Sequence, residues 1–121
     1  MIIYKIVPAA LWRESEAAGR FRGSPVDLQD GFIHFSTARQ VRDTAAKHFA
    51  GVSDLLLVAI DEEIAGGRKP LGLPAALRWE PSRGGDLFPH LYTDLPLAAV
   101  RWVKPLPLSP AGLHQFPDLE E

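Results

Sequence analysis

Three short stretches of this sequence alternate polar and apolar residues, and this alternation limits the chain to a fold that contains several short strands. The stretches are Phe32–Ser36, Leu77–Glu80 and Phe88–Tyr92. Because successive side chains of a strand point to opposite faces, each stretch places a polar pair on one face and apolar residues on the other. The polar pairs are His34 with Ser36, Arg78 with Glu80, and His90 with Tyr92. If the three strands are neighbours, we expect their polar faces to form one cleft.

Other apolar runs predict further strands. Ile2–Val7 alternates and is rich in β-branched residues. Asp54–Ile60 is an almost unbroken apolar run, so we expect a central strand that is covered on both faces. Val100–Leu106 is expected to be the last strand. Pro89 lacks an N–H, which predicts that the strand containing it is an edge strand or is bulged.

Two main helices are predicted. One runs over residues 8–19, with a proline in its first turn and Gly19 at its end. The other directly follows the Phe32–Ser36 strand: Thr37 can cap it, Gln40 can reach back, and Gly51 ends it. Residues 21–29 are expected to be a loop, and residues 61–76 a surface excursion with at most one helical turn.

These elements indicate an α+β fold with a small bent or split mixed β-sheet and two main helices. We expect one compact domain over residues 1–106, because a chain of this length can bury a core without disulfides. Residues 107–121 are rich in proline and in acidic residues, and they are expected to be a loosely packed tail.

Charge and composition exclude several classes of function. The formal net charge is -2 and no run of Lys or Arg is present, so we expect no nucleic-acid partner. The absence of cysteine excludes disulfides and thiolate chemistry, and the four histidines lack metal-ligand spacing, so no metal is expected. The first residues do not resemble a signal peptide, and no run reaches the roughly 18 apolar residues of a membrane span. The default expectation is a soluble cytoplasmic protein.

The first candidate group is His34, Ser36 and Thr37. The N-terminus of a helix carries unpaired N–H groups and partial positive charge, so a helix that begins at Thr37 favours an anion there. Beside the two hydroxyls, a phosphate or diphosphate could bind. The alternative is that Ser36 and Thr37 only cap the helix, and that His34 is a partly buried histidine with a structural partner.

The second and third groups come from the later strands. Arg78 and Glu80 can form a structural ion pair, or Glu80 can be a carboxylate that binds ribose hydroxyls or stabilises a developing cation. His90 can donate or accept a proton near neutral pH, and Tyr92 offers a hydroxyl and a ring for stacking. The alternative for His90 and Tyr92 is that they anchor the neighbouring glycine-rich loop.

At these residues the chain resembles the domain of unknown function 952 family. The resemblance extends from Tyr4 to about Leu106 and is strongest at Asp30–Ala38, Arg78–Glu80 and Phe88–Tyr92. That family usually places glycine after the tyrosine, whereas this chain has Thr93.

The family is grouped with the ADP-ribosyltransferase-like superfamily, whose split β-sheet binds NAD in a cleft. This resemblance implies an NAD-type or other nucleotide-like ligand, with NAD as a substrate rather than a resident cofactor. Gly31–Thr37 is similar to the superfamily's strand-and-serine element, with His34 at the place where many relatives carry tyrosine. The late-strand glutamate of the transferases has no secure counterpart, and Glu80 is a candidate by its chemistry alone.

Three hypotheses about function follow. The first is a nucleotide site in which His34, Glu80 and His90 are catalytic for ADP-ribosyl transfer or N-glycosidic cleavage, while Ser36, Thr37, Arg78 and Tyr92 bind the ligand. The second is a binding module that recognises a small molecule or peptide without turnover. The third is a two-histidine phosphoesterase, because His34-Phe35-Ser36 resembles half of its paired His-x-Ser/Thr motif and two histidines can act as acid and base.

Overall fold

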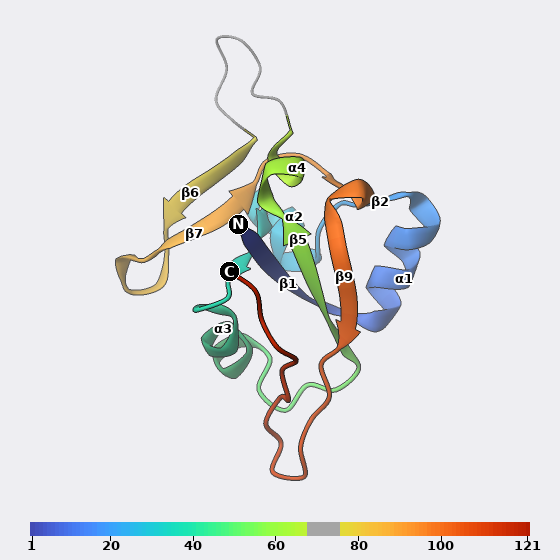
Figure 1. Ribbon diagram of the computed structural model, residues 1–121, viewed down its shortest axis with the longest axis vertical. Coiled ribbons are helices and arrows are strands. Elements are labelled where there is room, and N and C mark those ends of the chain that lie inside the picture. The colour runs from blue at the N-terminus through green and yellow to red at the C-terminus, as the bar shows by residue number, and fades with distance from the viewer. Residues whose placement is uncertain (68–75) are drawn as a thin grey trace.

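The computed structural model describes residues 1–67 and 76–121, and a four-stranded antiparallel sheet forms its centre (Figure 1). Strand β5 (Leu55–Asp61) pairs with β1 (Ile2–Pro8) on one side and with β9 (Val100–Pro105) on the other. A two-residue strand, β4 (Ser36–Thr37), pairs with the other edge of β1. The predicted central strand is therefore confirmed, because β5 has a neighbour on each side and is mostly buried.

One face of this sheet carries the larger core. Ile3 and Val7 of β1 are fully buried in a cluster that includes Trp12 of helix α1 (Ala9–Ala18). Helix α1 matches the predicted range of 8–19 within one residue at each end, and Gly19 ends it with a positive φ of 83°, a conformation that glycine adopts readily. The same cluster includes apolar residues from the second sheet, so it joins the two sheets.

The opposite face carries a second cluster. Tyr4 and Ile6 point to this side, and helix α3 (Val41–His48) covers them with Val41 and Ala45. The predicted helix therefore exists, but it begins at Val41 and not at Thr37. Thr37 belongs to β4 instead, because its backbone pairs with β1.

The second sheet has three antiparallel strands in the order β3-β7-β6. These are β3 (Ile33–His34), β7 (Leu87–Leu91) and β6 (Leu77–Pro81). Their registers align His34 with His90 and His90 with Arg78, so the three side chains share a face. The expectation that the three alternating stretches are neighbours is confirmed for Ile33–His34, β6 and β7. Phe32–Ser36 is not one strand, however, because Ser36 belongs to β4 and pairs with β1 in the four-stranded sheet. Ile33, Leu91 and Leu77 lie on the opposite face and join the core.

The expectation for Pro89 is wrong, because β7 is the central strand of its sheet and pairs with β6 without a register shift. Pro89 lies beside the point where β3 has ended. There its carbonyl accepts a hydrogen bond of 3.0 Å from Phe35 N, so the position of the missing N–H also faces β3, and the one ladder bond that Pro89 cannot make is the return bond at the end of that short strand. A proline is tolerated in this central strand because one of its neighbours has only two residues.

Two of the remaining segments differ from the predicted loops. Residues 21–29 contain the end of β2 (Arg20–Phe21), which pairs with β8 (Leu95–Pro96), and most of helix α2 (Pro25–Asp30). The excursion after β5 begins with the short helix α4 (Glu62–Gly66), as expected, and its residues 68–75 lie outside the described residues. The 3-10 turns are η1 (Arg83–Gly85) and η2 (Leu97–Ala99).

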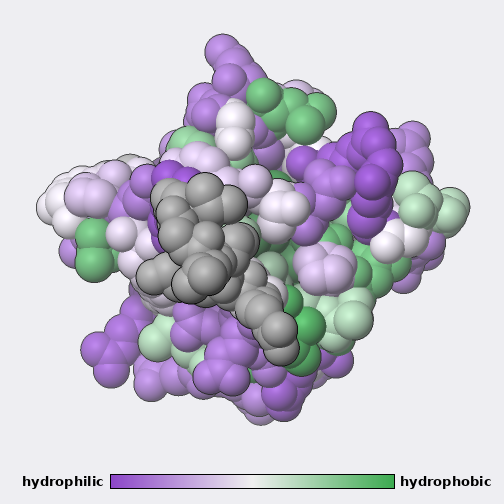
Figure 2. All heavy atoms as spheres, turned by 90° about the horizontal axis from the view of Figure 1, so that it is seen from above, coloured by the Kyte–Doolittle hydropathy of each residue, from purple (hydrophilic) through white to green (hydrophobic). Residues whose placement is uncertain are grey.

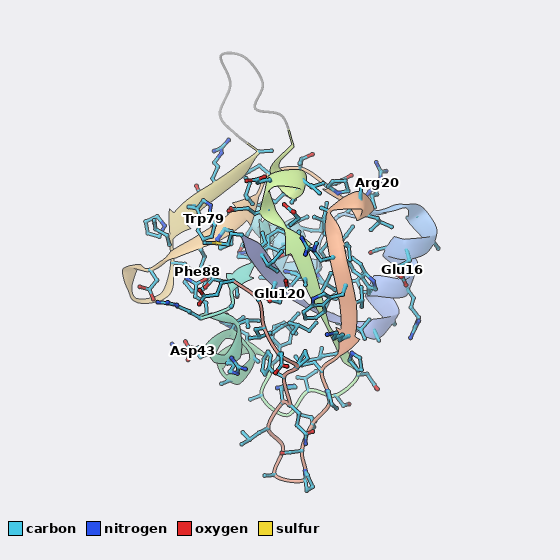
Figure 3. All side chains as sticks on the ribbon, viewed as in Figure 1. Glu16, Arg20, Asp43, Trp79, Phe88 and Glu120 are labelled. Atoms are coloured by element: carbon cyan, nitrogen blue, oxygen red, sulfur yellow. The ribbon has the colours of Figure 1, made fainter. Side chains whose placement is uncertain are left out.

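The C-terminal segment folds back across the four-stranded sheet on the side of α3 (Figure 1). Phe116 and Leu119 pack against the second core cluster. The hydroxyl of Tyr4 donates to Glu120 O and accepts from Glu120 N, both at 2.7 Å. Figure 3 shows Glu120 in front of the sheet. The segment is therefore held by specific contacts, in contrast to the loose packing expected from its composition.

The α+β class is as predicted. The pairing differs from the mixed sheet that was expected, because all the strand pairs among the described residues are antiparallel. Seen from above, hydrophilic residues form much of the visible surface, and hydrophobic residues show in the hollows between them (Figure 2). Among the described residues, no helix has the length and apolar character needed to cross a membrane.

Candidate functional site

A buried ion pair lies between the two sheets. Lys5 is on the core face of β1, and its Nζ lies 2.8 Å from Asp27 Oδ2 and 3.0 Å from Asp27 Oδ1. Both side chains are almost completely buried. Lys5 Nζ also donates to the backbone carbonyl of His34 at 2.9 Å, so one ammonium joins β1, α2 and β3. Burial lowers the pKa of Lys5, and the charge of Asp27 opposes that shift.

Local backbone geometry places Asp27 at this position. Ser24, which precedes α2, donates to Asp27 Oδ2 from its backbone N at 2.8 Å and from its hydroxyl at 2.9 Å. Gly23 has a φ of 123°, and a Cβ atom there would lie 2.8 Å from Asp27 Cβ. Only glycine fits there without a shift of the chain. The Gly23-Ser24-Pro25 sequence therefore positions the Asp27 carboxylate as well as forming a turn.

His34 is held between two carboxylates. Its Nδ1 lies 2.6 Å from Asp27 Oδ1, and its Nε2 lies 3.0 Å from Asp30 Oδ2. The backbone N of His34 also donates to Asp27 Oδ1 at 3.1 Å. Burial would raise the pKa of Asp27, but the hydrogen bond from His34 and the charge of Lys5 outweigh burial and hold that pKa well below its usual range.

The second histidine has its own carboxylate. His90 Nδ1 lies 2.9 Å from Glu80 Oε1, and the hydroxyl of Tyr92 donates to the same oxygen at 2.6 Å. These two hydrogen bonds, from Tyr92 first and then from His90, lower the pKa of Glu80, and the bond to Glu80 raises the pKa of Tyr92. His90 is buried and Glu80 is about one-third exposed. The guanidinium of Arg78 lies 4.2 Å from the centre of the Tyr92 ring.

An aromatic residue packs the two histidines together. The ring of Phe32 stacks on His90 with 4.2 Å between centroids and lies 4.6 Å from His34. It also contacts Tyr92 at 5.1 Å. The two imidazoles are 5.3 Å apart in an edge-to-face arrangement. Phe32 therefore restricts the rotation of both rings.

Both histidines line a cavity of about 590 Å³, a size typical of sites for small organic molecules. Its wall comes from β1, α2, α3 and the second sheet. Figure 3 shows Phe88, one of the lining residues, on the β7 side near α3. Most of the lining surface is apolar, and the lining residues with polar side chains are Tyr4, Lys5, Ser24, Asp30, His34, Ser36, Thr44, His48, Ser82 and His90.

The structure separates the predicted site residues into two groups. His34, Ser36 and His90 line the cavity, whereas Thr37, Arg78, Glu80 and Tyr92 do not. Ser36 Oγ bonds to Thr44 Oγ1 at 2.9 Å, and Thr37 N donates to Gln40 Oε1 at 3.0 Å. Because α3 begins four residues after Thr37, the expected anion site at a helix start beside these hydroxyls does not form.

The sequence analysis missed Lys5, Asp27, Asp30 and Phe32. Two of them carry a signal in the sequence. Lys5 interrupts a strand of buried residues on the face of Ile3 and Val7, and Phe32 is two residues before His34. Asp27 carries no comparable signal, because it lies in residues 21–29, which the sequence predicts to be a loop. Asp30 opens the segment Asp30–Ala38 of strongest resemblance, but nothing in the sequence shows that its side chain faces His34. Among the described residues, no group of three or more His, Asp or Glu side chains is arranged to hold a metal ion.

Comparisons with known proteins agree with this architecture. The family model described as "Protein of unknown function (DUF952)" matches residues 6–103. The crystal structure of protein CC0527 from Caulobacter crescentus is 44% identical, with a TM-score of 0.84 over 95% of this chain and 94% of that chain. The solution NMR structure of the same protein is 46% identical, with a TM-score of 0.77 over 94% and 91% of the two chains. No curated protein matches the chain.

Proposed function

The chain belongs to the DUF952 family of proteins of unknown function, and we propose that it binds a small organic molecule in the cavity and exchanges a proton with it through His90. The observation that carries this proposal is the Glu80–His90 pair, in which His90 lines the cavity and Glu80 lies outside the lining. The Glu80 carboxylate accepts a hydrogen bond from His90 Nδ1. The neutral ring therefore carries its proton on Nδ1, and Nε2 keeps a free lone pair. Among the described residues, none is hydrogen-bonded to His90 Nε2.

This arrangement is the one that general base catalysis requires. A carboxylate holds the imidazole in one tautomer and orientation, and the second nitrogen meets the reacting group. The stacked Phe32 ring restrains the orientation further. Tyr92 shares the same Glu80 oxygen and stabilises the carboxylate from the outer side. Positioned acid–base groups typically contribute roughly 10²- to 10⁴-fold to a rate.

The lining supports a ligand with an apolar or aromatic body. Nucleosides and the nicotinamide riboside part of NAD are of this kind, and they connect the proposal to the nucleotide-like ligand implied by the resemblance. A diphosphate finds less support, because Asp27 neutralises the cavity-lining Lys5. Stabilisation of an oxocarbenium ion by Glu80 also finds less support, because Glu80 does not line the cavity.

A library of metabolites, with NAD, ADP-ribose and free nucleosides included, tests the proposal by thermal shift. A ligand that binds the native state raises the melting temperature. We expect at least one compound to stabilise the wild type and to lose about tenfold or more in affinity with His90→Asn and with Glu80→Gln. His114→Asn is the matched control, since His114 contacts the carbonyl of Val52 away from the cavity. Hits that bind all three variants equally would contradict the proposal.

A specific observation also favours phosphodiester cleavage as a second candidate. His34 and His90 are cross-strand partners that line one cavity, so one could act as acid and the other as base. Turnover of a 2′,3′-cyclic nucleotide that is lost in both His34→Ala and His90→Ala would support this reaction. Turnover retained in either variant would exclude a two-histidine mechanism.

A further inference from the structure

We propose that Asp30 is a displaceable internal anion, and that the cavity takes a small organic acid whose carboxylate replaces Asp30 at His34 Nε2. This inference names a ligand class for the proposed function and rests on it. The carboxylate would contact His34 while the body of the molecule fills the apolar part of the cavity, within reach of His90.

The two carboxylates that flank His34 differ in how firmly they are held. Asp27 is 1% exposed and is fixed by Lys5, by Ser24 and by the backbone of His34. Asp30 is 42% exposed, and among the described residues its side chain has one ionic contact, with His34 Nε2 at 3.0 Å. It is also the last residue of a short helix, followed by Gly31 with a φ of 87°. An exposed ion pair of this kind contributes little to stability, so its replacement costs little.

The charges of the four linked side chains, Lys5, Asp27, His34 and Asp30, favour a ligand with one negative charge. Lys5 and Asp27 neutralise each other, and His34 can donate from both ring nitrogens only as an imidazolium. With Asp30 in place, the four groups then sum to zero. If Asp30 turns out to solvent, one positive charge remains at the wall of the cavity. A carboxylate restores the balance, whereas a phosphate dianion would leave an excess negative charge.

The positions of Asp30 and His34 also support a carboxylate ligand. Asp30 and His34 both line the cavity, so the oxygen that now contacts Nε2 is already at the cavity wall. The centres of the His34 and His90 rings are 5.3 Å apart. One ligand can therefore contact both imidazoles. In this arrangement His34 fixes the acid group, and His90 Nε2 meets a neighbouring hydrogen of the ligand.

Removal of Asp30 should strengthen the binding of an acid, because the ligand no longer competes with the internal carboxylate. The probes are benzoate, the neutral isostere benzamide, and phenyl phosphate, titrated into the full chain and followed by the ring ¹⁵N signals of His34. We expect benzoate to shift the His34 Nε2 signal, and Asp30→Ala to lower the dissociation constant of benzoate about fivefold or more. Benzamide and phenyl phosphate should bind at least about tenfold more weakly than benzoate.

Glu16→Gln is the charge-matched control, because Glu16 is exposed on α1 on the other side of the molecule (Figure 3). Its benzoate affinity should equal that of the wild type. The inference is overturned if benzoate binds the wild type and Asp30→Ala equally, if Glu16→Gln strengthens binding as much as Asp30→Ala, or if phenyl phosphate binds more tightly than benzoate. A neutral metabolite that depends on His90, found together with no benzoate binding, would overturn this inference and leave the proposed function standing.

Discussion

Lys5 shows at the scale of one residue how the site is held together. Its ammonium is buried and meets both oxygens of Asp27 and the carbonyl of His34, so it fixes the carboxylate and the strand that carries the first histidine. A buried charge without its partner is strongly unfavourable. The role of Lys5 is therefore to position Asp27 and His34.

Substitution of Lys5 by Met should destabilise the protein by about 3–5 kcal/mol, because it leaves the Asp27 carboxylate buried without its cation. Lys47→Met is the control, since Lys47 forms an exposed pair with Asp43 and should cost less than about 1 kcal/mol. Urea unfolding measures both values. Equal losses in the two variants would show that the buried pair does not support the fold.

The acid stability of the protein should depend on Asp27. Burial acts to raise the pKa of Asp27, but His34 and Lys5 lower it well below the value of about 4 that is normal for an unfolded chain. The folded state therefore prefers the ionised form, and this stabilisation is complete above about pH 4 and is lost as the pH falls toward the folded pKa. We expect Asp27→Asn to unfold with a shallower pH dependence than the wild type between about pH 2 and pH 4. Parallel curves would contradict this linkage.

The sequence reveals the two histidines and Glu80, which holds His90, but not the groups that hold His34. His34 and His90 are visible because polar residues interrupt apolar strands. The partners of His34 come from helix α2, most of which lies in the predicted loop, and from Lys5, whose role the strand pattern of β1 does not indicate. Glu80 was recognised, but its role depends on the direction of its side chain, which alternation alone does not give.

At the scale of elements, the predictions that failed are those next to the two-residue strands β3 and β4. The helix predicted from Thr37 begins at Val41, because the backbone of Thr37 pairs with β1. Pro89 occupies a central strand, because its neighbour β3 ends after two residues. The long strand β5 and helix α1 followed their local patterns closely. Local propensity predicted the long elements, whereas tertiary pairing set the two-residue strands.

The hydroxyl of Tyr4 joins the C-terminal segment to the first strand. Tyr4 is also one of the residues that line the cavity. Tyr4→Phe removes both hydrogen bonds to Glu120, and we expect a loss of about 1–3 kcal/mol in the free energy of unfolding. The amide of Glu120 should then exchange with deuterium faster, while the amides of β5 keep their relative protection. Unchanged exchange at Glu120 would mean that this contact does not hold the segment.

At the scale of the whole molecule, the four-stranded and the three-stranded sheet share one core, and a cavity lies at their junction. The four-stranded sheet supplies Lys5, and the three-stranded sheet supplies His34 and His90 in register. The α+β class and the neighbouring alternating strands could be predicted from the sequence. The cavity could not, because it depends on how α2 packs beside β3 and how α3 packs beside β1 and β4.

The most direct test of the account is the tautomer of His90, measured from its ring ¹⁵N chemical shifts at a pH where the ring is neutral. We expect a proton on Nδ1, bonded to Glu80, and an unprotonated Nε2 whose signal responds to ligand. Glu80→Gln should weaken this preference. A neutral ring with its proton on Nε2, in the wild type and in Glu80→Gln alike, would contradict the claim that Glu80 prepares His90 to accept a proton in the cavity.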